Sequence, residues 1–76
     1  MKILAVDDDD SIRDLLTLQL RRHGYDVVTA ADGEEALEKA PDADFIVLDL
    51  MLPKLDGYEV CRRLKSAEKT KNIPII

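Results

Sequence analysis

The sequence contains few cysteine, proline, glycine and aromatic residues, and fewer basic residues than acidic ones. Its single cysteine excludes an internal disulfide framework, so we expect a reducing, cytoplasmic setting. Eleven basic against sixteen acidic residues give a formal net charge of -5, which argues against binding nucleic acid or an anionic membrane. No apolar run approaches the roughly 20 residues of a membrane span. The start, MKILAVDDDD, does not resemble a signal peptide.

The length sets a further limit. A chain of 76 residues can form one small domain, over residues 1–76, and buries only roughly 60% of its unfolded surface. Large enzymes, multidomain architectures and repeat arrays are therefore excluded. With 46% hydrophobic and 36% charged residues, the composition is that of a globular protein.

Four short apolar runs divide the sequence, at residues 3–6, 27–30, 45–48 and 73–76. Uninterrupted apolar runs of four to eight residues are typical of strands buried on both faces, as in parallel sheets covered by helices. We therefore expect four strands.

Helical patterns lie between these runs. The first is predicted from about residue 11 to residue 23, with Ser11 and Asp14 resembling a capping box and Gly24 ending the helix in a left-handed conformation. Its apolar stripe consists of Ile12, Leu15, Leu16 and Leu20. Two shorter helices are predicted at 33–39 and at 57 to about 67. Each follows an aspartate with a glutamate three positions later: Asp32 with Glu35, and Asp56 with Glu59.

The predicted order is strand, helix, strand, helix, strand, helix, strand, which is an α/β alternation with right-handed crossovers. The last predicted strand, at 73–76, coincides with the end of the sequence. A buried strand at that position leaves a sheet edge and apolar surface uncovered, and self-association is one way to cover both.

Aspartates follow two of the predicted strands directly. Asp7 and Asp8 come after the first strand, and Asp49 ends the third. Because ligands gather at the carboxyl ends of parallel strands, we expect these carboxylates to converge there. Two such charges about 4 Å apart repel by roughly 4 kcal/mol at an effective dielectric near 20. A hard divalent cation such as magnesium suits this oxygen-only set.

Two other interpretations of the acidic run remain. Asp9 and Asp10 are better explained as the start of a helix, where carboxylates interact favourably with the helix dipole. Asp7 and Asp9 also resemble the nucleophile and acid pair of a phosphatase-like enzyme. The chain is too short for that family, and the aspartate after the third strand does not belong to its pattern.

The segments VDDDDSIRDLL, ADGEEAL, FIVLDLMLPKLDGYEVCRRL and NIPII together resemble the receiver domain of two-component response regulators, and LDLMLPKLDG is a specific match. The resemblance runs from Lys2 to Ile76. It implies a flavodoxin-like (CheY-like) parallel sheet with strand order 2-1-3-4-5. The sequence would supply its first four strands and first three helices, without the last strand and the last two helices.

The resemblance also implies a chemistry, in which a sensor histidine kinase transfers a phosphoryl group to an aspartate and magnesium is required. By position, Asp49 would be the phospho-acceptor and a ligand of the ion, Asp8 would be a direct ligand, and Asp7 would act through a metal-bound water. Met51 would give the ion its backbone carbonyl. Pro53 would shape the loop after the third strand. A chain of this type is a signalling domain and not a conventional enzyme.

Gly57 would allow the turn into the third helix, although an ordinary loop-to-helix junction explains Pro53 and Gly57 equally well. The family's lysine and its serine or threonine, which contact the phosphoryl group, fall beyond residue 76. We therefore expect weak or no phosphoryl transfer. The alternative function is an inert receiver fragment that forms a homodimer or higher homo-oligomer through its exposed sheet edge.

Overall fold

The computed structural model describes residues 1–49 and 56–76 and confirms the predicted alternation of strands and helices through the third helix. The strands are β1 (Lys2–Val6), β2 (Asp26–Ala30) and β3 (Phe45–Leu48). The helices are α1 (Asp10–Arg22), α2 (Gly33–Lys39) and α3 (Gly57–Ser66), with a 3-10 turn at Ala40–Asp42 after α2. None of the described helices is long and apolar enough to cross a membrane.

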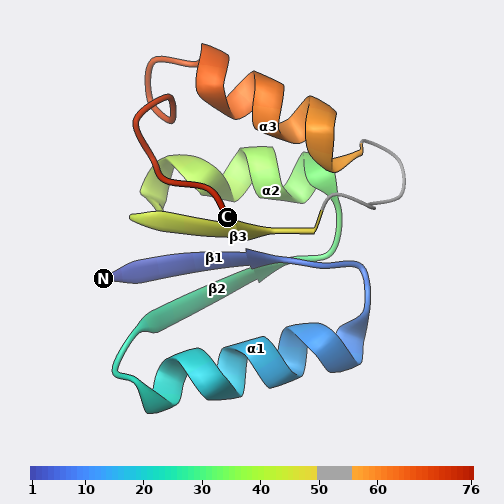
Figure 1. Ribbon diagram of the computed structural model, residues 1–76, viewed down its shortest axis with the longest axis vertical. Coiled ribbons are helices and arrows are strands. Elements are labelled where there is room, and N and C mark those ends of the chain that lie inside the picture. Colours follow the sequence, from blue (N-terminus) through green and yellow to red (C-terminus); the bar gives the residue numbers. More distant parts are fainter. Residues whose placement is uncertain (50–55) are drawn as a thin grey trace.

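The three strands form one parallel sheet in the order β2-β1-β3. Figure 1 shows three layers, with α1 on one face of the sheet and α2 and α3 on the other. This arrangement follows from right-handed crossovers between parallel strands, which place the connecting helix of each unit on a defined face. Because all strands run the same way, their carboxyl ends lie at one end of the sheet.

The main core lies between the sheet and the pair α2 and α3. Leu4 and Val6 of β1 point to this side and pack with Ile46 of β3 and with Val60 and Leu64 of α3, all of them buried. The alternate residues of β1, Ile3 and Ala5, are also buried. Side chains alternate between the two faces of a strand, so β1 is covered on both, as its uninterrupted apolar run predicts.

Helix α1 covers less of the sheet than the sequence pattern predicts. It packs against β2 and β1, and none of its residues is buried. Of the predicted stripe, Leu16 and Leu20 are half-buried, whereas Ile12 and Leu15 are 44% and 56% exposed. The stripe is wider than the area of contact with the sheet, so one flank of it faces outward.

Three of the four residues predicted to cap a helix are confirmed. Asp32 and Asp56 cap α2 and α3 by accepting the backbone N–H of Glu35 and Glu59, each at 2.9 Å. Gly24 has a φ of 86°, the left-handed conformation that glycine adopts without steric cost. The predicted N-cap of α1 was wrong. Asp9, not Ser11, precedes the helix, and its carboxylate accepts the N–H groups of Ser11 and Ile12.

The fourth predicted strand is present only as a short parallel pairing. Residues 73–76 lie beside β3, with a single bridge between Ile46 and Ile75. Ile46 donates its N–H to the carbonyl of Pro74 at 3.0 Å, and Ile76 donates to the carbonyl of Ile46 at 3.0 Å. The ladder does not continue toward the amino end of this segment because Pro74 has no N–H to donate.

Candidate functional site

Sheet hydrogen bonds extend past the ends of β1 and β3 and hold the first residue after each strand. Asp7 donates its backbone N–H to the carbonyl of Ala30 at 3.1 Å, and Asp49 donates to the carbonyl of Val6 at 3.0 Å. Asp7 and Asp49 therefore leave the sheet from neighbouring strands at the same level. Asp8 follows in the loop from β1 to α1.

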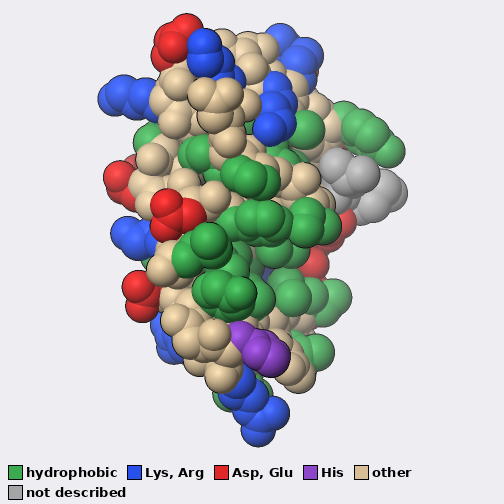
Figure 2. All heavy atoms as spheres, turned by 60° about the vertical axis from the view of Figure 1, so that its left-hand side comes forward, with side chains coloured by type: hydrophobic (Ala, Val, Ile, Leu, Met, Phe, Trp, Pro, Cys, Tyr) green, Lys and Arg blue, Asp and Glu red, His purple; other side chains and the backbone are tan. Residues whose placement is uncertain are grey.

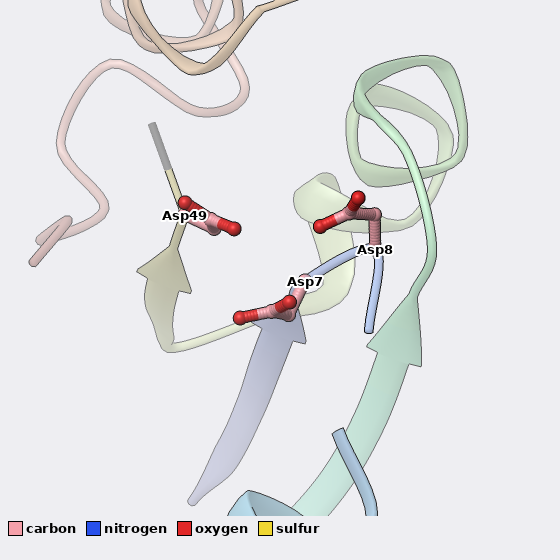
Figure 3. Close-up of side chains that lie close together, drawn as sticks. All are labelled: Asp7, Asp8 and Asp49. Atoms are coloured by element: carbon pink, nitrogen blue, oxygen red, sulfur yellow. The ribbon is translucent and has the colours of Figure 1, made fainter. Parts of the chain in front are cut away.

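The predicted convergence of the three carboxylates is confirmed. One carboxylate oxygen from each of Asp7, Asp8 and Asp49 lies within 4.8 Å of the other two. In Figure 3, Asp8 and Asp49 point toward each other across the end of β1, and Asp7 lies at that end between them. Asp7 is buried, Asp49 is half-buried and Asp8 is exposed, so the cluster opens to solvent on the side of Asp8.

The donor set fits magnesium. Carboxylate oxygens are the hard ligands that this ion takes, at about 2.0–2.1 Å in octahedral geometry. Opposite ligands of such an ion lie about 4.2 Å apart. At most one pair among three ligands can be opposite, and adjacent ligands lie about 2.9 Å apart, so the three oxygens, now within 4.8 Å of one another, draw closer together when an ion binds. An ion would also relieve the repulsion among the three negative charges, which solvent already screens on the exposed side of Asp8.

Asp9 and Asp10 belong to the helix, as their position in the acidic run predicts. Asp9 is the N-cap of α1, and Asp10 lies in its first turn. Asp9 also donates its N–H to the Asp7 carboxylate at 2.9 Å. The run DDDD therefore divides into a pair at the cluster and a pair at the helix terminus.

Arg13 is a neighbour of the cluster that the sequence analysis missed. Its Nη1 donates to the backbone carbonyl of Asp7 at 2.7 Å, and its Nη2 pairs with the Asp10 carboxylate. The signal available in the sequence was a positive side chain near the start of α1, where it opposes the helix dipole and needs a local acceptor. Arg13 stands three positions after Asp10, which is the spacing of such a pair.

The remaining predicted site residues lie on the segment that follows Asp49. Met51 and Pro53 fall outside the described residues. Gly57 is buried and is the first residue of α3, directly after the N-cap Asp56. Its position agrees with the predicted start of the third helix.

Comparison with known proteins decides the family. The protein-family model of the response regulator receiver domain matches residues 3–76 of the sequence. The chain belongs to this family. Solved receiver domains also share its fold. The chemotaxis response regulator CheY4 of Vibrio cholerae superposes with a TM-score of 0.92 at 42% identity, over 97% of this chain and 63% of that chain.

Two further proteins extend the comparison, and the second of them bears on the site. The alkaline phosphatase synthesis transcriptional regulatory protein PhoP of Bacillus subtilis is 64% identical over 66 residues, which are 84% of this chain and 28% of PhoP. The receiver domain of a sensor histidine kinase from Pseudomonas aeruginosa PAO1 is 36% identical, with a TM-score of 0.92 over 97% of this chain and 62% of that one. That structure holds a magnesium ion coordinated in its active-site cleft.

The sequence spans 28% of the length of PhoP, and 63% and 62% of the two receiver structures. The family membership and the fold apply to the residues compared.

Proposed function

We propose that this receiver accepts a phosphoryl group on Asp49 and that Asp7 and Asp8 hold the magnesium ion required for the transfer. The observation that carries the proposal is the convergence of these three carboxylates within 4.8 Å at the carboxyl end of the sheet. Asp49 and the backbone carbonyl of Met51, by the family pattern, complete the protein ligands. The magnesium ion in the active-site cleft of the Pseudomonas receiver supports the choice of metal.

The phosphoryl donor in this proposal is a phosphohistidine on a sensor histidine kinase. A carboxylate oxygen of Asp49 forms a bond to phosphorus while the bond from phosphorus to the histidine nitrogen breaks, and the electron pair stays on that nitrogen. Bound magnesium supplies charge neutralisation for the incoming phosphoryl oxygens. Asp7 and Asp8 supply negative charge to hold the cation, and the sheet fixes Asp49 in position. The chain acts as a signalling domain in the cytoplasm, where it meets its kinase.

A magnesium titration tests the metal part of the proposal. Urea unfolding is measured with and without magnesium chloride, with sodium chloride added to hold the ionic strength constant. At one hundred times the dissociation constant, magnesium should stabilise the fold by about 2.7 kcal/mol. Asp8→Asn should remove most of this effect. Asp42→Asn, which removes an exposed aspartate outside the cluster, should retain it.

The proposal fails if magnesium stabilises the wild type and Asp8→Asn equally, or if it stabilises neither. Calcium at the same concentration is a useful comparison, since its ligand distances are longer, at about 2.3–2.6 Å. We expect calcium to stabilise the protein less than magnesium does.

We propose as a second function that the chain self-associates, with a second copy covering its outward apolar surface. Ile12 and Leu15 of α1 are exposed, and Phe45 and Val47 of β3 are only half-buried. Ile76, beside β3, is 77% exposed. Figure 2 shows hydrophobic side chains gathered over the middle of one face, with basic side chains toward its two ends. A second copy matches such a surface because the same apolar patch meets itself across a two-fold axis.

Sedimentation equilibrium over a range of concentrations tests this association. The average mass should rise above that of the monomer, and Leu15→Glu should lower it. Tyr58→Glu is the matched control, because Tyr58 is 70% exposed on α3, on the opposite side of the sheet. A wild-type protein that stays monomeric at high concentration would exclude the proposal.

A further inference from the structure

Arg13 connects the helix to the loop that carries the acidic cluster. Its side chain is only 17% exposed although it belongs to a helix with no buried residue. Nη1 donates to the carbonyl oxygen of Asp7 at 2.7 Å, and Nη2 pairs with the Asp10 carboxylate. The guanidinium thus reaches back from α1 and contacts Asp7 and Asp10, the two residues that flank Asp8 and Asp9.

The hydrogen bond to Asp7 fixes a particular peptide unit. The carbonyl of Asp7 belongs to the peptide bond between Asp7 and Asp8, and a peptide unit is planar. Holding its oxygen therefore fixes the plane that contains the nitrogen and Cα of Asp8, which limits the directions in which the Asp8 side chain can leave the backbone. Two other bonds hold Asp7 itself, from its N–H to Ala30 at 3.1 Å and from the N–H of Asp9 to its carboxylate at 2.9 Å. Arg13 therefore holds the peptide unit that precedes Asp8, and the Asp9 N–H holds the one that follows it.

The charge of Arg13 and its position have opposite effects on a bound cation. A guanidinium is always charged, so by charge alone it repels magnesium and weakens binding. By position it keeps Asp8 directed toward Asp49, which favours binding. Asp10 carries the opposite charge and is paired with the same guanidinium, so much of the repulsion is cancelled. The positional effect should therefore dominate.

We propose that Arg13 is a positioning residue for the acidic cluster, acting through the Asp7 carbonyl to orient Asp8 for the metal. This inference rests on the proposed function of the cluster. It predicts a change in magnesium affinity opposite in sign to the change expected from charge alone. Removing Arg13 should weaken magnesium binding, whereas removal of a nearby positive charge would otherwise strengthen it.

The test compares Arg13→Ala and Arg13→Lys with Arg21→Ala. Arg21 is an exposed basic residue in the last turn of the same helix, so its removal changes the net charge equally without touching the loop. Magnesium affinity is measured by calorimetric titration at constant ionic strength. We expect Arg13→Ala to bind magnesium about tenfold more weakly, as is found for groups that orient metal ligands. Arg13→Lys should recover part of the loss, and Arg21→Ala should bind as the wild type does or slightly more tightly.

A second readout needs no metal. Amide hydrogen exchange at Asp9 reports the Asp9-to-Asp7 hydrogen bond inside the loop. In Arg13→Ala this amide should exchange faster by more than the loss of global stability measured in urea accounts for. If all amides change by the same factor, Arg13 is merely structural and the proposal is overturned.

The two readouts separate the inference from the function on which it rests. If the wild type binds magnesium and Arg13→Ala binds it equally or more tightly, the proposed role of Arg13 is wrong. The metal site itself is then still supported. Wild-type protein that binds no magnesium overturns the metal site. Faster exchange confined to the loop of Arg13→Ala would then still support a positioning role for Arg13 on the loop.

Discussion

The backbone N–H of Asp49 donates to the carbonyl of Val6 at 3.0 Å, which ties the proposed phospho-acceptor to the residue just before Asp7. This bond continues the parallel ladder between β1 and β3, in which Val6 pairs with Leu48. The acidic cluster is therefore attached directly to the sheet at two of its three members. Such attachment keeps the three negative charges close together even though they repel one another.

Repulsion within the cluster predicts that Asp8→Asn stabilises the protein when no divalent cation is present. The substitution removes the exposed charge of the three and leaves Asp7 and Asp49 in place. We expect the free energy of unfolding in chelator to rise by roughly 1 kcal/mol, since an exposed charge is well screened by solvent. Urea denaturation in the presence of a chelator measures this change.

Salt provides the control for Asp8→Asn. The difference between wild type and variant should shrink at high ionic strength, where charges separated by several ångströms are screened. A variant that is less stable than the wild type in chelator would show that Asp8 makes a favourable contact in the folded protein. The account of a repulsive cluster would then be wrong.

The N-cap of α1 gives a prediction about stability alone. Asp9 accepts the N–H groups of Ser11 at 2.8 Å and of Ile12 at 3.2 Å. Asp9→Ala should therefore lower the free energy of unfolding by about 1 kcal/mol, the usual loss for an N-cap. Ser11→Ala should change it by much less, because Ser11 lies inside the helix and not at its cap. Equal losses in the two variants would contradict this assignment.

Glu35 makes part of the stability dependent on pH. Its pKa lies below the ordinary value of 4.5, chiefly because the Lys39 ammonium group binds its carboxylate at 2.8 Å and also because Ala31 donates a backbone N–H to it. A lowered pKa means that the folded state favours the ionised form. The contribution is therefore complete above pH 4.5 and is lost as the pH falls through the lower folded-state value.

Urea unfolding at neutral pH and at several pH values below 4.5 checks this prediction. Glu35→Gln should lose less stability than the wild type over the acidic range, because it has no carboxylate there to protonate. Glu34→Gln is the matched control, an exposed glutamate in the same turn of α2. It should follow the wild-type pH dependence. Parallel curves for the wild type and Glu35→Gln would refute the assignment.

Most of the fold was predictable because local signals and tertiary packing agree. The run at 45–48 is apolar without interruption and ends in an aspartate, and it forms a strand with those bounds. Asp32 and Asp56 each stand where a polar cap precedes a helix, and both act as caps. The convergence of Asp7 and Asp49 followed from the rule that parallel strands end at a common edge.

The errors arose where several residues could serve the same role or where tertiary contact decides. Four consecutive aspartates offered several possible caps for α1, and Ser11 with Asp14 imitated a capping box. The stripe on α1 did not reveal that Ile12 and Leu15 would face outward, because sequence spacing does not show how far a sheet extends under a helix. Arg13 was missed because its main acceptor is a backbone carbonyl, which has no sequence signature.

The most direct test of the central claim is phosphorylation of Asp49 itself. The protein is incubated with acetyl phosphate and magnesium, and its intact mass is measured beside Asp49→Asn and Asp42→Asn. The account predicts a weak, magnesium-dependent gain of one phosphoryl group, at low yield, in the wild type and in Asp42→Asn, and none in Asp49→Asn. An adduct that persists in Asp49→Asn, or no adduct on a folded wild-type protein that binds magnesium, would contradict it.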